Sequence, residues 1–118
     1  MSVTVAQAGA LATKKVKLST TAATTIYQAE DGLAAVILEI NIANTDAAST
    51  RQVTVDIWDG TTAYEIIKSA DIAIKARLSV TDIAVALLPG ESLRATASNA
   101  NTLVVIATVM EAQRFSGR

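Results

Sequence analysis

The feature that most constrains this chain is a two-residue alternation of apolar and polar side chains. In residues 35–43 one face collects Val36, Leu38, Ile40 and Ile42, and the other face carries Glu39 and Asn41. Residues 52–58 repeat the pattern, with Val53, Val55 and Ile57 on the apolar face. Successive side chains of a strand point to opposite faces, whereas side chains on one face of a helix recur about every 3.6 residues. The alternation therefore predicts half-buried β-strands.

Residues 71–80 test how far this pattern extends, because the segment is also the best candidate for a helix. One face of the segment collects Ile72, Ile74, Ala76, Leu78 and Val80, so the alternation predicts one continuous strand. Composition agrees, since Val, Ile and Thr favour the pleated sheet and account for 37 of the 118 residues. The 23 alanines favour a helix, but periodicity outweighs propensity.

Turn residues divide the remaining apolar segments into short strands. We predict further strands at residues 14–18, 24–28, 83–88, 92–98 and 102–112. Pro89–Gly90 suits the central positions of a type II turn, and Asn99–Asn101 predicts another reversal. About eight short strands joined by such turns predict an all-β fold, an antiparallel β-sandwich or a jelly roll.

Asp59–Gly60 predicts a hairpin turn directly after the strand at 52–58. A two-residue type I′ turn would pair Trp58 with Thr61, Val55 with Tyr64 and Val53 with Ile66. A four-residue loop would instead place Asp56 opposite Glu65. Because like charges directly opposite each other destabilise a strand pair, the shorter turn is predicted.

Residues 103–106, with the sequence Leu-Val-Val-Ile, are apolar on both faces of their predicted strand. Ile37 and Ile67 also fall on the nominally polar faces of their strands. Three explanations remain open: a central strand covered on both sides, incidental surface hydrophobes or a cover formed by the N-terminal segment, and an interface with another chain. A two-layer sandwich covers one face of each sheet, so we expect part of residues 102–112 to contact a partner.

The length of 118 residues predicts one domain, which is large enough to bury about two-thirds of its surface. We expect a single β-sandwich at residues 14–112, an N-terminal arm at 1–13 and a C-terminal tail at 113–118. The arm has no alternation and no charged residue, so we expect it to gain order on a partner. The chain has no apolar stretch of the roughly 18 residues that span a membrane and no basic secretory start, so we expect no membrane partner and synthesis in the cytoplasm.

The chain contains no His and no Cys, which excludes imidazole bases, thiolate nucleophiles, disulfides and most transition-metal sites. The closest carboxylate pairs, Glu30–Asp31 and Asp56–Asp59, lie at predicted turns and get no catalytic role. A calcium site would need several converging oxygen ligands, and the spacing of the candidates fits no known calcium motif. These candidates are Asp46, Asp56, Asp59 and Asp71. We therefore predict no enzyme activity, no catalytic, cofactor-binding or metal-binding residue, no cofactor and no small-molecule substrate.

Nucleic acid is not an expected partner, because the formal net charge is −1, with 10 basic and 11 acidic residues. Lys14, Lys15 and Lys17 form one basic run, which is interpreted as a solvated face. Trp58 is a candidate for stacking on a sugar, but Tyr64 is expected on the opposite face and aromatic residues are only 3% of the chain. The charged residues that can be placed alternate onto outward faces, where we expect solvent to surround them: Glu39, Asp56, Glu65, Lys75, Arg77 and Arg94.

Four segments together resemble small β-sandwich virion proteins of tailed bacteriophages. They are the strand and Asn-rich turn at 35–45, the strand at 53–58, the Leu88-Pro89-Gly90-Glu91 corner with the strand to Ala95, and the last apolar strand at 104–111, ending in Glu111. The resemblance covers about two-thirds of the chain. Each of these motifs is structural, so no binding residue is carried over.

This resemblance implies a non-enzymatic structural protein located in the virion. The best candidate is a capsid-decorating or cementing subunit on the major capsid shell. The alternative is a neck, tail or fibre-associated module, including a carbohydrate-binding one used in host attachment. The partners implied are the major capsid protein or other virion proteins, and further copies of the chain in a homo-oligomer.

Overall fold

The computed structural model describes residues 10–30, 32–81 and 83–111. These residues form nine strands and contain no helix. The strands are β1 (Ala10–Lys17), β2 (Thr24–Gln28), β3 (Ala35–Asn44), β4 (Arg51–Trp58), β5 (Ala63–Ile72), β6 (Arg77–Val80), β7 (Val85–Leu87), β8 (Ser92–Ala97) and β9 (Leu103–Glu111).

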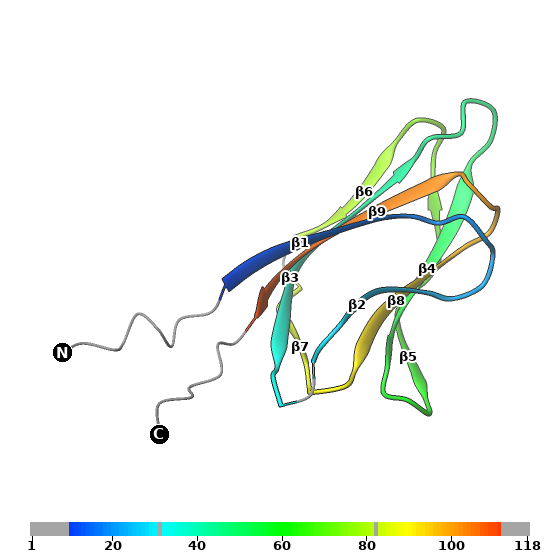
Figure 1. Ribbon diagram of the computed structural model, residues 1–118. Coiled ribbons are helices and arrows are strands. Elements are labelled where there is room, and N and C mark those ends of the chain that lie inside the picture. The colour runs from blue at the N-terminus through cyan, green and yellow to red at the C-terminus, as the bar shows by residue number, and fades with distance from the viewer. Residues whose placement is uncertain (1–9, 31, 82, 112–118) are drawn as a thin grey trace, which may run out of the picture.

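The strands make two antiparallel sheets that pack face to face (Figure 1). One sheet has the order β1-β9-β3-β6, with β7 also paired with β3, and the other has the order β2-β8-β4-β5. Because β6 and β7 pair with successive parts of β3, nine strands fill the eight positions of a jelly roll. The predicted all-β sandwich is confirmed.

The core lies between the two sheets, as the alternation requires. Val53, Val55 and Ile57 of β4 are buried, as are Leu93, Ala95 and Ala97 of β8, in agreement with the predicted faces. On β9 the buried side chains are Leu103, Val105, Ala107 and Val109. All ten belong to one continuous apolar cluster, so a single core supports both sheets.

A β-bulge in β3 corrects the predicted inward face of residues 35–43. In the pairing of β3 with β9, Ile37 lies opposite Val109 and Glu39 opposite Thr108, so Leu38 is an extra residue. The extra residue reverses the alternation on its N-terminal side. Ile37 is therefore fully buried, whereas Val36 and Leu38, predicted to point inward, are only half-buried. Ile40 and Ile42 are buried as predicted.

The hairpin between β4 and β5 has the four-residue loop, so the two-residue turn predicted at Asp59–Gly60 is wrong. Trp58 pairs with Ala63, and Asp56 lies opposite Glu65. The side chain of Asp59 accepts hydrogen bonds from the backbone N–H groups of Thr61 (2.8 Å) and Thr62 (2.7 Å), which favours the longer loop.

The like charges across this hairpin are tolerated because each carboxylate has its own cation. Arg94 of β8 contacts Asp56 through Nε (2.9 Å) and Nη2 (3.2 Å). Asp56, predicted to be surrounded by solvent, is therefore buried beneath this ion pair. Lys68 lies 3.1 Å from Glu65. The repulsion that the sequence argument relied on is therefore offset by residues that the hairpin alone does not reveal.

Residues 71–80 form two strands in different sheets, and not the single strand that the alternation predicts. β5 ends at Ile72, and β6 begins at Arg77 in the opposite sheet. The crossing uses Lys75 at a φ of 60°, a left-handed conformation that breaks an extended strand. The backbone N–H of Ala76 donates to the carbonyl of Ala73 (3.0 Å) and closes the turn.

Most other predicted strand boundaries agree within a few residues, and β2 has the predicted bounds. The Pro89–Gly90 turn is confirmed, since Gly90 has a φ of 88° and the N–H of Glu91 donates to the carbonyl of Leu88 (3.0 Å). Residues 10–13, the end of the predicted arm, belong to β1. Residues 1–9 and the predicted tail lie outside the described residues.

Candidate interaction surfaces

The outer face of the five-stranded sheet carries an apolar row from three strands. Leu11 of β1, Met110 of β9 and Val36 of β3 are neighbours in the strand pairing. Leu11 is 66% exposed, and Ile106, further along β9, is 36% exposed. Val104, Met110 and Val36 are half-buried. No second layer covers this face in the described part of the chain, so it is available for contact with another protein.

Burial and strand pairing explain two of the unexpected apolar residues. Ile37 belongs to the core because of the β3 bulge. Ile67 lies opposite Val55 and packs against the core as a half-buried side chain. The outer face of β9 remains as a surface that no other described strand covers. We call this surface, formed by Leu11, Val36, Val104, Ile106 and Met110, the outer apolar face.

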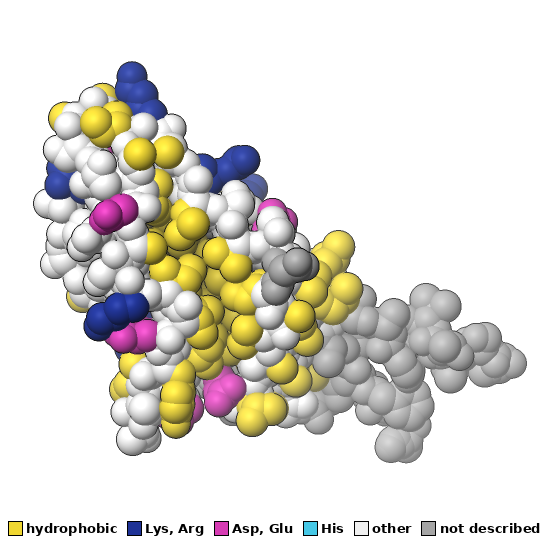
Figure 2. Space-filling model, turned by 180° about the vertical axis from the view of Figure 1, so that it is seen from behind, with side chains coloured by type: hydrophobic (Ala, Val, Ile, Leu, Met, Phe, Trp, Pro, Cys, Tyr) yellow, Lys and Arg dark blue, Asp and Glu magenta, His cyan; other side chains and the backbone are white. Residues whose placement is uncertain are grey.

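A second apolar region lies on the side of the sandwich seen in Figure 2. Hydrophobic side chains gather there in a hollow that runs down the middle of this face. Partly buried apolar residues of the edge strands pack against the core: Ile67 and Ala70 of β5, Leu78 and Val80 of β6, and Val85 of β7. Tyr64 at the start of β5 is 56% exposed. The two sheet edges therefore leave part of the core boundary accessible.

The basic run lies on β1, at the edge of the five-stranded sheet. Lys15 pairs with Ile106 and Lys17 with Val104, so both lysines border the outer apolar face. Lys14 points to the other side, where its Nζ lies 5.9 Å from the centre of the Tyr27 ring. All three side chains are exposed.

Tyr27 connects the two sheets next to Lys14. Its hydroxyl donates to Oε2 of Glu111 at the end of β9 (2.6 Å). Burial raises the pKa of Tyr27 above its ordinary value, and the hydrogen bond to Glu111 raises it further. The phenol therefore stays protonated and keeps donating this bond, which ties the end of β9 to the second sheet.

The four aspartates considered as calcium ligands do not come together. Arg51 donates to Asp46 through Nε (2.8 Å), and the Arg94 guanidinium pairs with Asp56. Asp59 is occupied by its own loop, and Asp71 accepts a hydrogen bond from Gln52 (2.9 Å). Among the described residues no group of three or more metal-ligating side chains is found. Asp31 of the other carboxylate pair lies outside the described residues.

Hydrogen bonds from the backbone explain why two of these carboxylates are stable as anions. The backbone N–H of Ala48, followed by the guanidinium of Arg51, lowers the pKa of Asp46. The N–H groups of Thr62 and Thr61 lower the pKa of Asp59. The carboxylate oxygens of both residues accept hydrogen bonds within their own turns, so their role is to hold the shape of these loops.

We expect removal of metal ions to leave the protein unchanged. The aspartates are held by arginines, a glutamine or backbone N–H groups, so no bound ion is needed to stabilise the native state. The thermal midpoint should be the same with and without a chelator. A fall of several degrees that calcium reverses would contradict this prediction.

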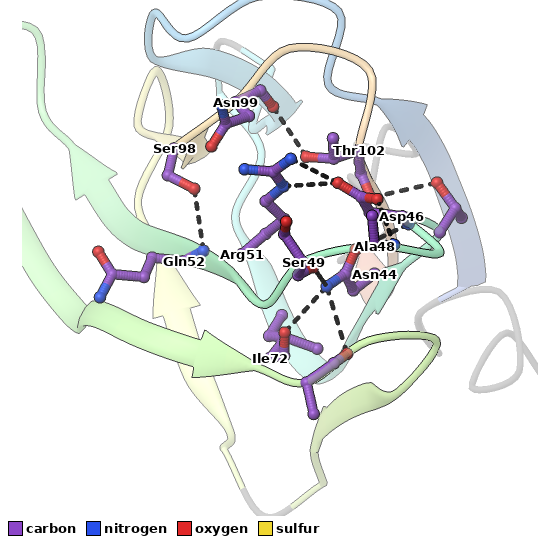
Figure 3. A network of polar contacts seen from close by, with 12 residues as sticks. Asn44, Asp46, Ala48, Ser49, Arg51, Gln52, Ile72, Ser98, Asn99 and Thr102 are labelled. Carbon is purple, nitrogen blue, oxygen red and sulfur yellow. Dashed lines mark hydrogen bonds and ion pairs between the residues drawn. The ribbon is translucent and has the colours of Figure 1, made fainter.

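Figure 3 shows the polar network around Asn44, which the sequence argument missed. The Asn44 side chain is buried, and its Nδ2 lies within hydrogen-bond distance of the carbonyls of Ser49 (3.0 Å), Ile72 (2.9 Å) and Ala73 (3.2 Å). Its Oδ1 accepts from the N–H of Asp46 (2.9 Å). The network joins the β3–β4 loop to the crossing between sheets, so its role is structural. The Asn-rich turn predicted at the end of residues 35–45 includes Asn44, but alternation alone did not predict that its side chain is buried.

Trp58 and Tyr64 do not form a sugar-stacking pair. Trp58 is half-buried, and the guanidinium carbon of Arg94 lies 4.2 Å from its ring centre. Tyr64 pairs with Ile57, the neighbour of Trp58 on the opposite face. The two rings thus point to different sides of the sheet, as predicted.

No protein-family model and no curated protein matches the sequence. Among solved structures, the fold is similar to a chain in the acidic stable capsid structure of Helicobacter pylori bacteriophage KHP30. The TM-score is 0.59 at 16% identity, covering 91% of this chain and 90% of that one. A chain of the cyanophage Pam1 capsid asymmetric unit is similar at a TM-score of 0.50 and 17% identity, covering 87% and 86%. This likeness establishes the fold. The resemblance to small phage β-sandwich proteins is thereby confirmed at the level of architecture.

Within the described residues no helix is present that could cross a bilayer.

Proposed function

We propose that this chain is a non-enzymatic structural subunit of a bacteriophage virion that decorates or cements the major capsid shell. The observation that carries the proposal is the likeness to a KHP30 capsid chain over about nine-tenths of both chains. The match covers 90% of that chain and is not limited to one domain of a larger protein. The Pam1 capsid chain supports the proposal in the same way.

The outer apolar face is the surface that we assign to docking on the shell. It combines a 66% exposed Leu11 with the exposed Ile106 on a central strand, a position that sandwiches normally keep polar or cover. The hollow of Figure 2 lies on another side of the molecule and leaves room for contacts between copies in a homo-oligomer. The two surfaces together suit a subunit that contacts both its own copies and a shell.

A neck, tail or fibre position is the alternative within the same class, and copy number separates it from a shell position. A carbohydrate-binding role has less support. The two candidate rings face different sides, and Trp58 already stacks on Arg94. The described residues also bring no metal cluster together.

Replacing Ile106 with glutamate tests the docking surface. We expect Ile106→Glu to fold like the wild type, because the side chain is exposed and Lys15 lies beside it, but to lose most of its binding to shells. Co-sedimentation with particles that lack the chain measures binding, and circular dichroism checks the fold. Thr25→Glu, on the outer face of the other sheet, is the matched control. Equal binding by all three proteins would exclude this face, and failure of the wild type to bind would contradict the proposed function.

A further inference from the structure

We propose that the free edge of β1 binds an extended acidic segment of a partner protein as an added strand. The inference rests on the proposed function only for the identity of the partner, which would be a neighbouring virion protein. The site itself is defined by the backbone of β1 and by its three lysines.

The backbone of β1 offers a regular template. Its eight residues pair with Glu111–Val104 of β9 without a register shift, and β1 ends the strand order of its sheet (Figure 1). In an antiparallel pair every second residue directs its N–H and C=O away from the partner strand. Along β1 these groups point to the free edge, where an extended chain could pair with them.

The other sheet edges are much less suitable. β5 has two register shifts against β4, and Ser69 within it has a φ of 48°. β2 has five residues and a register shift, β6 has four residues and β7 has three. Bulges and short strands prevent edge pairing. In the described part of the fold, β1 is therefore the one long, regular edge.

The charge of β1 indicates what kind of strand can bind. β1 contains Lys14, Lys15 and Lys17 and no acidic residue, and the described residues provide no ion pair to any of them. The whole chain has a formal net charge of −1, so the rest of the chain carries −4. The positive charge is thus concentrated on the one regular edge, which favours an acidic partner strand.

Lysines on an edge strand usually discourage pairing, and here they make the pairing selective. A second β1 would bring three more lysines to the same edge. A strand with carboxylates at alternate positions would instead place them opposite Lys15 and Lys17 on the outer face. The residue between them would lie opposite Val16, which packs against the core. The expected motif is acidic–apolar–acidic.

A synthetic peptide with alternating Glu and Val, flanked by Thr, tests this site. We expect it to bind the full chain, and to bind about tenfold more tightly than the same peptide with Gln for Glu. In hydrogen-exchange NMR it should protect every second amide of Ala10–Lys17. The double variant Lys15→Glu/Lys17→Glu should lose binding of the Glu peptide. Lys75→Glu, in the exposed turn between β5 and β6, should bind like the wild type.

Three outcomes would overturn the proposal: no protection of β1 amides by the Glu peptide, equal binding by the double variant, or protection that appears without peptide as protein concentration rises. The last outcome would place a second copy of the chain on the edge of β1.

Particle binding separates this proposal from the proposed function. A double variant that binds shells like the wild type removes β1 as the contact but keeps the function. A wild type that binds the peptide but no shell contradicts the function alone.

Discussion

Ile37→Ala should lower the free energy of unfolding by about 3 kcal/mol, because Ile37 is fully buried in the core and the shorter side chain leaves a cavity. Leu38→Ala should cost less than about 1 kcal/mol, because Leu38 is the half-buried extra residue of the bulge. Chemical unfolding measures both values. In a domain of this size the first change should lower the thermal midpoint by about 15 °C.

This pair of variants tests the β3 bulge directly. Regular alternation from Ile40 and Ile42 would put Leu38 in the core and Ile37 outside. With the bulge, Ile37 lies in the core and Leu38 lies outside it. A larger loss of stability for Leu38→Ala than for Ile37→Ala would therefore show that β3 pairs without a bulge and that its first half faces the other way.

The Asp56–Arg94 pair should contribute far more to stability than the exposed Lys68–Glu65 pair of the same sheet. Arg94 contacts Asp56 through two nitrogens and stacks on Trp58. Both charged side chains are largely buried. Asp56→Ala leaves the guanidinium without its partner, so we expect a loss of about 3 kcal/mol. The matched control is Glu65→Ala, which breaks the exposed Lys68–Glu65 pair and should cost about 0.5 kcal/mol or less.

A double-mutant cycle separates the interaction from the loss of either side chain. Asp56→Ala combined with Arg94→Met removes both charges, so the double variant should lose less stability than the two single variants added together. Additive losses would show that the two side chains do not depend on each other. The pairing of two like-charged residues, Asp56 and Glu65, across the hairpin would then need another explanation.

The fold class could be predicted from the sequence because alternation is a local property of each strand. Most strand positions, the Pro89–Gly90 turn and the outward face of β9 followed from residues a few positions apart. The core faces of β4 and β8 were correct for the same reason. These features depend on the pleat alone.

The errors arose where a distant residue decides local structure. The bulge at Leu38 keeps Ile37 and Ile40 both facing inward, and it depends on the pairing with β9. The four-residue loop is tolerated because Arg94, 38 residues from Asp56, neutralises that carboxylate. The break near Lys75 is stabilised by Asn44, whose amide lies close to the carbonyls of Ile72 and Ala73. Periodicity contains none of these long-range partners.

The candidate surfaces were predictable to a similar extent. The two-sided apolar character of residues 103–106 indicated an uncovered face, and the structure adds Leu11 and Val36 to it through strand pairing. The sequence also contained the lysines of β1. It did not reveal that they lie on the one long, regular edge among the described strands, because that property depends on irregularities in the other edge strands.

The central claim is that this chain is a structural subunit of the virion shell. Quantitative mass spectrometry of purified virus particles produced from the genome that encodes this chain tests this claim most directly. We expect the chain in the particles at a copy number comparable to that of the major capsid protein. A few copies per particle would place it at the neck or tail, and its absence from purified particles would contradict the account.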